Sequence, residues 1–151
     1  MNRLEMETPV GWLAIEAKAD RLSAVRWGRA ADAFPTPVLA EARSQLDAYF
    51  SGTLEDFDLP FDPPASPFAA DIREAMLAIP FGETLTYGDI AARIGASPQA
   101  VGQGCGANPL PILVPCHRVL GANGLGGFSG GTGIETKVAL LRHEGAAGLL
   151  I

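Results

Sequence analysis

The chain has 151 residues, of which 48% are hydrophobic, and a formal net charge of −6 at pH 7. A hydrophobic core is therefore available, but no apolar stretch approaches the roughly 20 residues of a membrane-spanning helix. The acidic segment from Met1 to Val10 lacks the apolar core of a secretory signal. Because Cys105 and Cys116 are the only cysteines and no CxxC pair exists, we expect a reduced, cytoplasmic protein with neither a disulfide framework nor a metal site.

The charged residues are unevenly distributed along the chain. Residues 1–64 hold six Lys or Arg and eleven Asp or Glu, whereas residues 65–151 hold five and six. Proteins that bind nucleic acids usually present a basic surface, because phosphate contacts contribute much of their affinity. The overall acidity argues against nucleic-acid binding, and the nearly neutral C-terminal part weakens that objection.

The N-terminal part predicts a small lobe of strands and one helix. Trp12–Ala17 and Leu22–Trp27 are strand-like segments separated by a turn, which indicates a β-hairpin. Residues 38–50 carry apolar side chains at helical spacing. The following connector, residues 51–67, contains four prolines and four acids and ends this lobe. We therefore expect two domains, 1–64 and 65–151.

The C-terminal part predicts short helices. Residues 67–79 form one, with Ser66 as its N-cap, and residues 134–144 form the last, ended by Gly145. Between them, a helix capped by Thr86 stops at Gly95, and another capped by Ser97 follows at once. Two helices joined by a tight turn with glycine are typical of a helix-turn-helix, whose second helix contacts a DNA groove.

The second of these helices is unusually rich in small residues. Residues 100–107 are Ala, Val, Gly, Gln, Gly, Cys, Gly and Ala. Small side chains permit close packing against another helix, and they equally permit close approach to a nucleic-acid backbone. The residues alone leave both explanations open.

One short segment combines a nucleophile with a base. Cys116 follows Pro115 and precedes His117, and a cysteine becomes strongly nucleophilic when a base or positive charge stabilises its thiolate. Side chains of adjacent residues point in opposite directions on an extended segment, so their contact requires a bridging water or a turn of the backbone. The histidine then needs an orienting carboxylate, and Glu135 and Glu144 are candidates. An isolated Cys-His pair is more often a structural thiol beside a core histidine, so the wider sequence decides.

That wider sequence resembles a known family. Residues 108–119 are NPLPILVPCHRV, which is similar to the active-site segment of the O6-alkylguanine-DNA alkyltransferases, also called methylated-DNA–protein-cysteine methyltransferases. The resemblance covers residues 67–145. It also includes segments at 79–84, 86–91, 128–131 and 137–145, and extends weakly to 8–11 and 45–50.

The resemblance implies a fold and a reaction. The expected fold is α+β, with an N-terminal lobe of β-sheet and helix and a C-terminal helical domain that holds the helix-turn-helix and the cysteine. The implied reaction is direct repair of double-stranded DNA, in which the alkyl group of O6-alkylguanine moves to Cys116 in a single turnover. No diffusible cofactor is implied, and we expect a monomer. The target nucleotide must be flipped out of the stack, which costs about a few kcal/mol.

The family's catalytic roles apply to four matching residues. Cys116 would accept the alkyl group, and His117 would act as its base through a water. Glu144 would orient His117, and Asn108 would brace the active-site turn. The chemistry is sensible because a thiolate is a soft nucleophile toward carbon and hydrogen bonding improves guanine as a leaving group.

Substrate and DNA contacts are implied in the same way. Tyr87 would polarise the flipped guanine, while Ser129 and backbone groups near Val114 and Cys116 would hold its edge. The small-residue helix would enter the minor groove. The expected DNA contacts are Gln99, Ala100, Gly102, Gln103 and Arg118.

Three features depart from the family. Gln99 stands where members usually carry an arginine that fills the gap left by the flipped base, and no Lys or Arg lies between Arg93 and Arg118. We therefore expect weaker and less salt-dependent DNA binding than in the family at large. Phe128 replaces a common tyrosine, and the absence of Cys and His before Cys105 excludes the N-terminal zinc site of some members.

Three other functions compete with repair. A non-repairing lesion-recognition protein of the same fold lacks the acceptor cysteine, which this chain has. A cysteine hydrolase would need a separately oriented histidine, and no motif for one is visible. A protein-binding module would leave the specific string around Cys116 unexplained. Labelling of Cys116 by an alkylated guanine distinguishes repair from all three.

Overall fold

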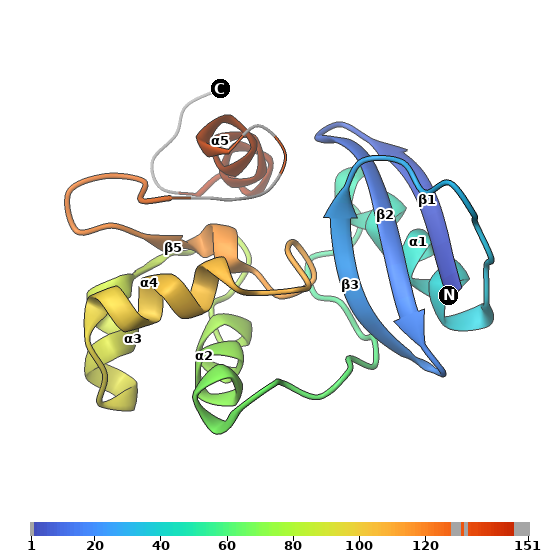
Figure 1. Cartoon of the computed structure of the whole chain (residues 1–151). Coiled ribbons are helices and arrows are strands. Elements are labelled where there is room, and N and C mark those ends of the chain that lie inside the picture. Colours follow the sequence, from blue (N-terminus) through green and yellow to red (C-terminus); the bar gives the residue numbers. More distant parts are fainter. Residues whose placement is uncertain (1, 128–130, 132, 147–151) are drawn as a thin grey trace. The chain divides into compact units, whose positions relative to one another are not determined.

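The computed structural model describes residues 2–127, 131 and 133–146. The chain forms two compact units, Met1–Asp62 and Pro63–Ile151 (Figure 1). The sequence places the boundary two residues later, within the same proline-rich connector. The predicted α+β fold class is confirmed, with an antiparallel sheet in the first unit and helices dominating the second.

The first unit is a three-stranded antiparallel sheet covered by one helix. Its strands β1 (Asn2–Thr8), β2 (Gly11–Lys18) and β3 (Arg21–Trp27) lie in the order β1-β2-β3. The predicted hairpin is confirmed, because β2 pairs with β3. Strand β1 was not among the predicted elements, although Leu4 and Met6 alternate with charged residues and are buried.

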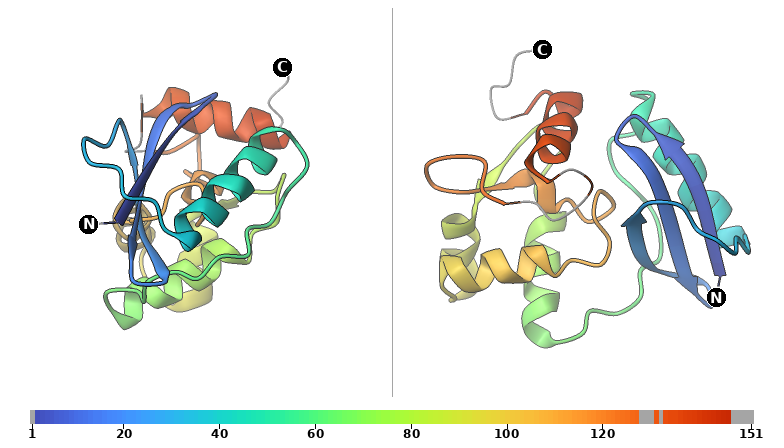
Figure 2. Two further views of the ribbon diagram at one scale, coloured as in Figure 1. Left: turned by 90° about the vertical axis from the view of Figure 1, so that its right-hand side faces the viewer. Right: turned by 45° about the horizontal axis from the view of Figure 1, so that its top comes forward.

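Helix α1 (Pro37–Phe50) packs on this sheet (Figure 2). Its buried side chains follow helical spacing, at Leu39, Ala42, Leu46 and Tyr49. They form a core with the buried side chains of β2 and β3, such as Leu13, Ile15 and Leu22. This burial of apolar surface is the main force that holds the unit together.

The second unit contains four helices and a short parallel strand pair among its described residues. The helices are α2 (Pro67–Leu77), α3 (Tyr87–Ile94), α4 (Pro98–Gly106) and α5 (Ile134–Glu144). The strands β4 (Leu85–Thr86) and β5 (Val119–Leu120) pair in parallel. A single 3-10 turn, η1 (Cys116–Arg118), precedes β5.

The predicted caps set the helix-turn-helix. Thr86 and Asp89 form a reciprocal capping box at the start of α3, which ends at Gly95 with a φ of 73°. That φ lies in the left-handed region that glycine adopts without steric cost. The Ser97 hydroxyl then accepts a hydrogen bond from the Ala100 N–H and starts α4. The turn between α3 and α4 is therefore defined by local chemistry.

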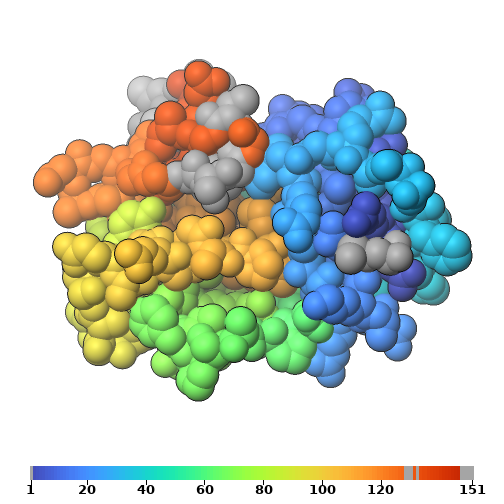
Figure 3. Space-filling model, in the orientation of Figure 1, coloured from blue at the N-terminus to red at the C-terminus, as the bar shows by residue number. Residues whose placement is uncertain are grey.

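The small residues of α4 divide between the two explanations that the sequence left open. A side chain at Gly104 would overlap the Cδ1 atom of Ile72, so this glycine permits close packing of α4 on α2. A side chain at Gly102 or Gly106 would meet no other atom within 4 Å. In the space-filling view, yellow and orange side chains of α4 lie on the surface of the second unit (Figure 3). One glycine thus serves packing, and two leave an open surface.

No helix within the described ranges is long and apolar enough to cross a membrane.

Candidate active site

A tight turn presents Cys116. Pro115 has φ −80° and ψ 66°, and the Cys116 N–H donates to the Val114 carbonyl at 2.8 Å. The chain then enters η1, so the backbone turns at Cys116 rather than running on extended. Just before it, buried Ile112 has a φ of 73°, a strained conformation that costs about 1 to 3 kcal/mol for a side chain of this kind. Surrounding contacts must hold such a turn in place.

Asn108 supplies several of these contacts. Its Nδ2 donates to the Val114 carbonyl at 2.9 Å, and its Oδ1 accepts from the Leu110 N–H at 3.1 Å. Its own backbone N–H donates to the Cys105 carbonyl at 3.2 Å. Asn108 therefore ties the end of α4 to the turn that carries Cys116, as a bracing residue would.

His117 lies in a buried array with Glu144 and Arg118. His117 Nε2 is 2.8 Å from Glu144 Oε2, and Arg118 donates to the same carboxylate from Nε at 2.8 Å and from Nη2 at 3.0 Å. All three residues are buried, and the His117 side chain is 0% exposed. Of the two candidate carboxylates, the structure brings Glu144 to His117 and leaves Glu135 exposed.

The array determines which nitrogen of His117 can act as a base. An ionised carboxylate only accepts hydrogen bonds, so His117 Nε2 must carry the hydrogen that faces Glu144. The other nitrogen, Nδ1, is buried and has no hydrogen-bond partner among the described residues. Burial lowers the pKa of His117, against the opposing effect of Glu144, so the imidazole is neutral near pH 7. His117 can therefore accept a proton at Nδ1.

Cys116 is half-buried and is a thiol rather than a thiolate in the resting protein. Burial raises the pKa of Cys116, whereas the Asn108 side chain, the Lys137 charge and two backbone N–H groups lower it. Because burial is the largest of these effects, a base must remove the proton before the sulfur can attack. His117, the next residue, is neutral, and its role as that base stays a prediction.

Lys137 lies at the site but was not among the predicted site residues. Its side chain is 0% exposed, and Nζ donates to the carbonyls of Val119 at 2.6 Å and Gly127 at 3.1 Å. Nζ also lies 5.7 Å from the ring centroid of Tyr87. Burial lowers the pKa of Lys137 to about 8, against the smaller opposing effect of Cys116 and Cys105 in their thiolate forms. The positive charge of Lys137 in turn lowers the pKa of Cys116.

The buried face of α5 is not its most apolar one. Ile134 is 42% exposed, and Val138 is only partly buried. The buried positions are Thr136, Lys137, Leu140, Leu141 and Glu144. The last four of these positions have helical spacing and share one face of α5. Lys137 and Glu144 lie at the two ends of this face, and that pattern could have identified Lys137 from the sequence.

Tyr87 is the first residue of α3 and packs against the loop after β5. A side chain at Gly126, where φ is 72°, would lie 2.9 Å from the Tyr87 hydroxyl oxygen. That hydroxyl is 3.5 Å from the Gly127 carbonyl, and burial raises the pKa of Tyr87. The phenol therefore remains a hydrogen-bond donor near pH 7, and Gly126 provides the space for its ring.

The remaining predicted residues lie in different surroundings. Gln99 and Gln103 are exposed on α4, and Ala100 and Gly102 are partly exposed. The carbonyl of buried Val114 already accepts from Asn108 and Cys116, so it supports the turn, and a role in holding the base stays a prediction. Ser129 and Phe128 lie outside the described residues.

Arg118 requires a correction. The sequence assigned it to DNA, but its side chain is 6% exposed and three of its nitrogens donate to Glu144 and the Ile79 carbonyl. A guanidinium held in this way is not available to a phosphate. The interpretation failed because a basic residue beside an active-site motif suggests either a DNA contact or an internal ion pair, and only the fold distinguishes them.

Cys105 is buried on α4. Burial raises its pKa to about 12, and the charge of Cys116 acts in the same direction. The Cys105 thiol therefore stays protonated near pH 7 and acts as a small packing residue.

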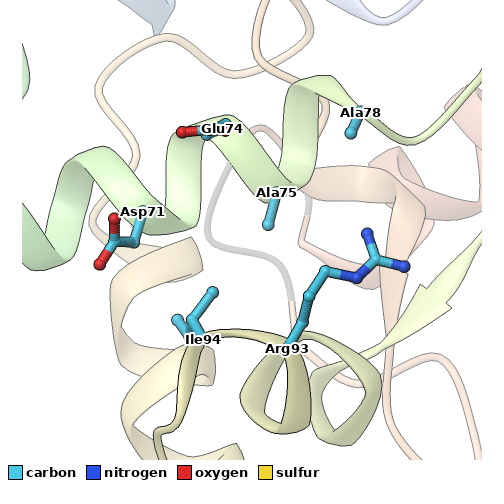
Figure 4. Close-up of a pocket in the computed structure, with 6 residues that line it drawn as sticks. All are labelled: Asp71, Glu74, Ala75, Ala78, Arg93 and Ile94. Carbon is cyan, nitrogen blue, oxygen red and sulfur yellow. The ribbon is translucent and has the colours of Figure 1, made fainter.

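A pocket of about 380 Å³ lies between α2 and α3 (Figure 4). Its lining residues are Asp71, Glu74, Ala75, Ala78, Arg93 and Ile94. None of the predicted site residues lines it, so it is separate from the site at Cys116.

Comparison with known proteins agrees with this geometry. Residues 67–146 match the family model of the 6-O-methylguanine DNA methyltransferase DNA binding domain, and residues 5–63 match that of the 6-O-methylguanine DNA methyltransferase ribonuclease-like domain. The constitutive methylated-DNA–protein-cysteine methyltransferase of Bacillus subtilis is 40% identical, over 91% of this chain and 92% of the relative. The methylated-DNA–protein-cysteine methyltransferase of Methanosarcina acetivorans is 37% identical, over 93% and 96%.

Solved structures give the same result. The crystal structure of Mycobacterium tuberculosis OGT in complex with DNA superposes with a TM-score of 0.85 at 39% identity, covering 96% of this chain and 93% of that one. The M. tuberculosis O6-methylguanine methyltransferase crystal structure gives 0.83 at 38% identity, covering 95% and 92%. The chain therefore belongs to the 6-O-methylguanine DNA methyltransferase family, also named methylated-DNA–protein-cysteine methyltransferases.

Proposed function

We propose that this protein repairs DNA by transferring the alkyl group of O6-alkylguanine to Cys116 in a stoichiometric, single-turnover reaction. The observation that carries the proposal is a half-buried thiol followed by a neutral histidine whose Nε2 faces Glu144 at 2.8 Å. The family and the names of its members support the same activity. A lesion-recognition protein without repair activity is not favoured, because the acceptor cysteine and its base are both present.

The chemical step follows from the protonation states. His117 Nδ1 takes the Cys116 proton, through one water, and the resulting thiolate attacks the alkyl carbon. The C–S bond forms as the bond between that carbon and O6 breaks, and the electron pair stays with guanine. The guanine anion then takes up a proton from solvent. Both imidazole nitrogens carry hydrogen after the first transfer, and Glu144 stabilises the cation that forms.

Two residues stabilise the negative charge as it develops. The Lys137 ammonium favours the thiolate at Cys116, because a positive charge in a buried site acts more strongly than in water. The Tyr87 hydroxyl donates a hydrogen bond to the departing guanine and remains protonated because burial raises its pKa. Gly126 leaves the space that the Tyr87 ring occupies.

Double-stranded DNA would bind at α4. The four remaining predicted contacts, Gln99, Ala100, Gly102 and Gln103, are exposed or partly exposed on this helix, and Gly102 faces open space. A helix with such small side chains can sit deep in the minor groove, and the neutral Gln99 would fill the gap beside the orphaned base. Because α4 carries no Lys or Arg, binding depends less on salt than in a basic helix.

We further propose that the protein acts as a cytoplasmic monomer and that the alkylated guanine itself is its substrate. Both cysteines are unpaired, which fits a reducing compartment. The reaction needs no second subunit in this scheme, since the described catalytic residues all come from one chain.

The test is the yield of repaired guanine. A duplex with O6-methylguanine is incubated in excess with wild type, Cys116→Ala and Cys105→Ala, and guanine formation is followed by chromatography of the nucleosides. We expect a plateau of one guanine for each wild-type or Cys105→Ala molecule and none for Cys116→Ala. Continued turnover beyond one equivalent would contradict the suicide reaction. Tight binding of damaged duplex without guanine formation would indicate lesion recognition instead.

A further inference from the structure

Arg118 makes contacts inside the protein that a role in DNA binding does not explain. Its Nε and Nη2 donate to the two oxygens of Glu144, at 2.8 and 3.0 Å, in a bidentate pair. Its Nη1 donates to the Ile79 carbonyl at 2.7 Å, and the guanidinium lies 5.8 Å from the ring centroid of Phe81. The guanidinium is therefore fixed in position and orientation.

These contacts act directly on Glu144. A carboxylate buried without a partner tends to take up a proton, because a low-dielectric environment disfavours its charged form. An arginine stays charged in proteins, and its planar fork matches the two carboxylate oxygens. The pair with Arg118 thus keeps Glu144 ionised where the Glu144 side chain is 0% exposed.

We propose that Arg118 is a positioning residue that sets the tautomer of His117 by keeping Glu144 ionised. The proposal rests on the base role of His117 proposed above. An ionised Glu144 can only accept the hydrogen bond from His117 Nε2, which leaves the lone pair on Nδ1 for the Cys116 proton.

The opposite tautomer follows if the guanidinium is removed. A neutral Glu144 carries its own O–H and donates it to His117 Nε2, so the imidazole hydrogen moves to Nδ1. An Nδ1 that already carries hydrogen cannot accept the proton of Cys116. His117 and Glu144 would then be inactive even at an unchanged distance, because the pair holds one more proton than in wild type.

Other charged groups surround the pair of His117 and Glu144. The groups that act on His117 are Glu144 and Lys137 from α5 and Arg118 from η1. Lys137 also interacts with Cys105 of α4 and Cys116 of η1, and its ammonium lies over the ring of Tyr87 from α3. The ring of His143 from α5 contacts the ring of Phe81. The positive charge of Arg118 disfavours the imidazolium form of His117. Loss of Arg118 should therefore let the pair of His117 and Glu144 take up a proton more readily.

Nitrogen-15 NMR of histidine-labelled protein tests this directly, because the chain has only two histidines, His117 and His143. In wild type we expect the His117 hydrogen on Nε2, with Nδ1 at the chemical shift of an unprotonated nitrogen. In Arg118→Gln we expect the hydrogen on Nδ1 near pH 7. A folded Arg118→Gln protein that keeps the wild-type tautomer overturns the proposal.

The pH profile of alkyl transfer is the second readout. Under single-turnover conditions near pH 7, Arg118→Gln should react about 10- to 100-fold more slowly than wild type. The deficit should shrink as pH rises, because Glu144 then loses its extra proton. A deficit of constant size at every pH would mean that Arg118 only supports the fold, which overturns the proposal. Arg142→Gln, which removes an exposed cation from α5, is the matched control and should behave as wild type.

Arg118→Lys keeps the proposal testable if Arg118→Gln does not fold. A lysine retains the charge but makes a single contact, so His117 should keep its hydrogen on Nε2 and the rate should fall only a few-fold. A change of tautomer in Arg118→Lys contradicts the proposal. The NMR readout does not depend on activity, so failure of Cys116 to accept an alkyl group would be recognised separately in the guanine yield.

Discussion

Replacing Lys137 with methionine tests whether the buried ammonium serves the reaction rather than the fold. Burial lowers its pKa from 10.5 to about 8, so keeping it charged in the folded protein costs on the order of 3 kcal/mol. The ammonium also satisfies the buried Val119 carbonyl, and leaving that carbonyl unpaired costs about 1 to 3 kcal/mol. Because these effects oppose each other, Lys137→Met should change the free energy of unfolding near pH 7 by no more than about 2 kcal/mol.

The pH dependence of stability identifies the Lys137 contribution. Between about pH 8 and 10.5 the unfolded chain holds the Lys137 proton and the folded chain does not, so this contribution to stability rises with pH. The unfolding free energy of wild type minus that of Lys137→Met should therefore rise by about 3 kcal/mol over that window. Urea unfolding of both proteins in reducing buffer measures it. A difference that stays flat with pH refutes the reasoning.

Activity should respond quite differently from stability. Without the cation the Cys116 thiolate is harder to form, and we expect alkyl transfer near pH 7 to slow by about 100-fold or more. Single-turnover rates measure this, and Arg142→Gln controls for a change in overall charge. A wild-type rate in Lys137→Met would show that the ammonium serves the fold alone.

Three further substitutions test other parts of the account. Glu144→Gln leaves the buried guanidinium of Arg118 without its carboxylate and should destabilise the protein by about 3 to 5 kcal/mol in thermal unfolding; an unchanged midpoint would contradict the buried pair. Gly126→Ala places a methyl group 2.8 Å from Tyr87 Cε2 and should slow alkyl transfer while binding of undamaged duplex stays unchanged, whereas equal rates would argue against that contact. Gln99→Arg should steepen the dependence of log affinity on log salt concentration by about 0.9 for one added phosphate contact, and no change in slope would place this residue away from DNA.

Local chemistry made much of the helical part predictable. The capping box at Thr86 and the left-handed Gly95 define α3 within a few neighbouring residues, and Ser97 starts α4 in the same way. The hairpin of β2 and β3 was likewise visible from its alternating pattern and turn. The resemblance around Cys116 supplied the roles of His117, and the structure then placed the required carboxylate beside it.

Long-range contacts account for what the sequence did not predict. β4 and β5 are two-residue strands far apart in the chain, and such short segments carry no periodic signal. The burial of Arg118 and Lys137 depends on backbone carbonyls contributed by other segments, at Ile79 and Val119. Buried charges are rare in soluble proteins, so a sequence argument assigns them to the surface unless their partners are known.

The most direct test of the central claim is the intact mass of the protein after reaction with duplex DNA containing O6-methylguanine. We predict that wild type gains the mass of one methyl group in place of one hydrogen, that peptide mapping places it on Cys116, and that Cys116→Ala gains nothing. Methylation of Cys105 or another residue, or a wild-type mass that stays unchanged while guanine is restored, would contradict the assignment of Cys116 as the alkyl acceptor.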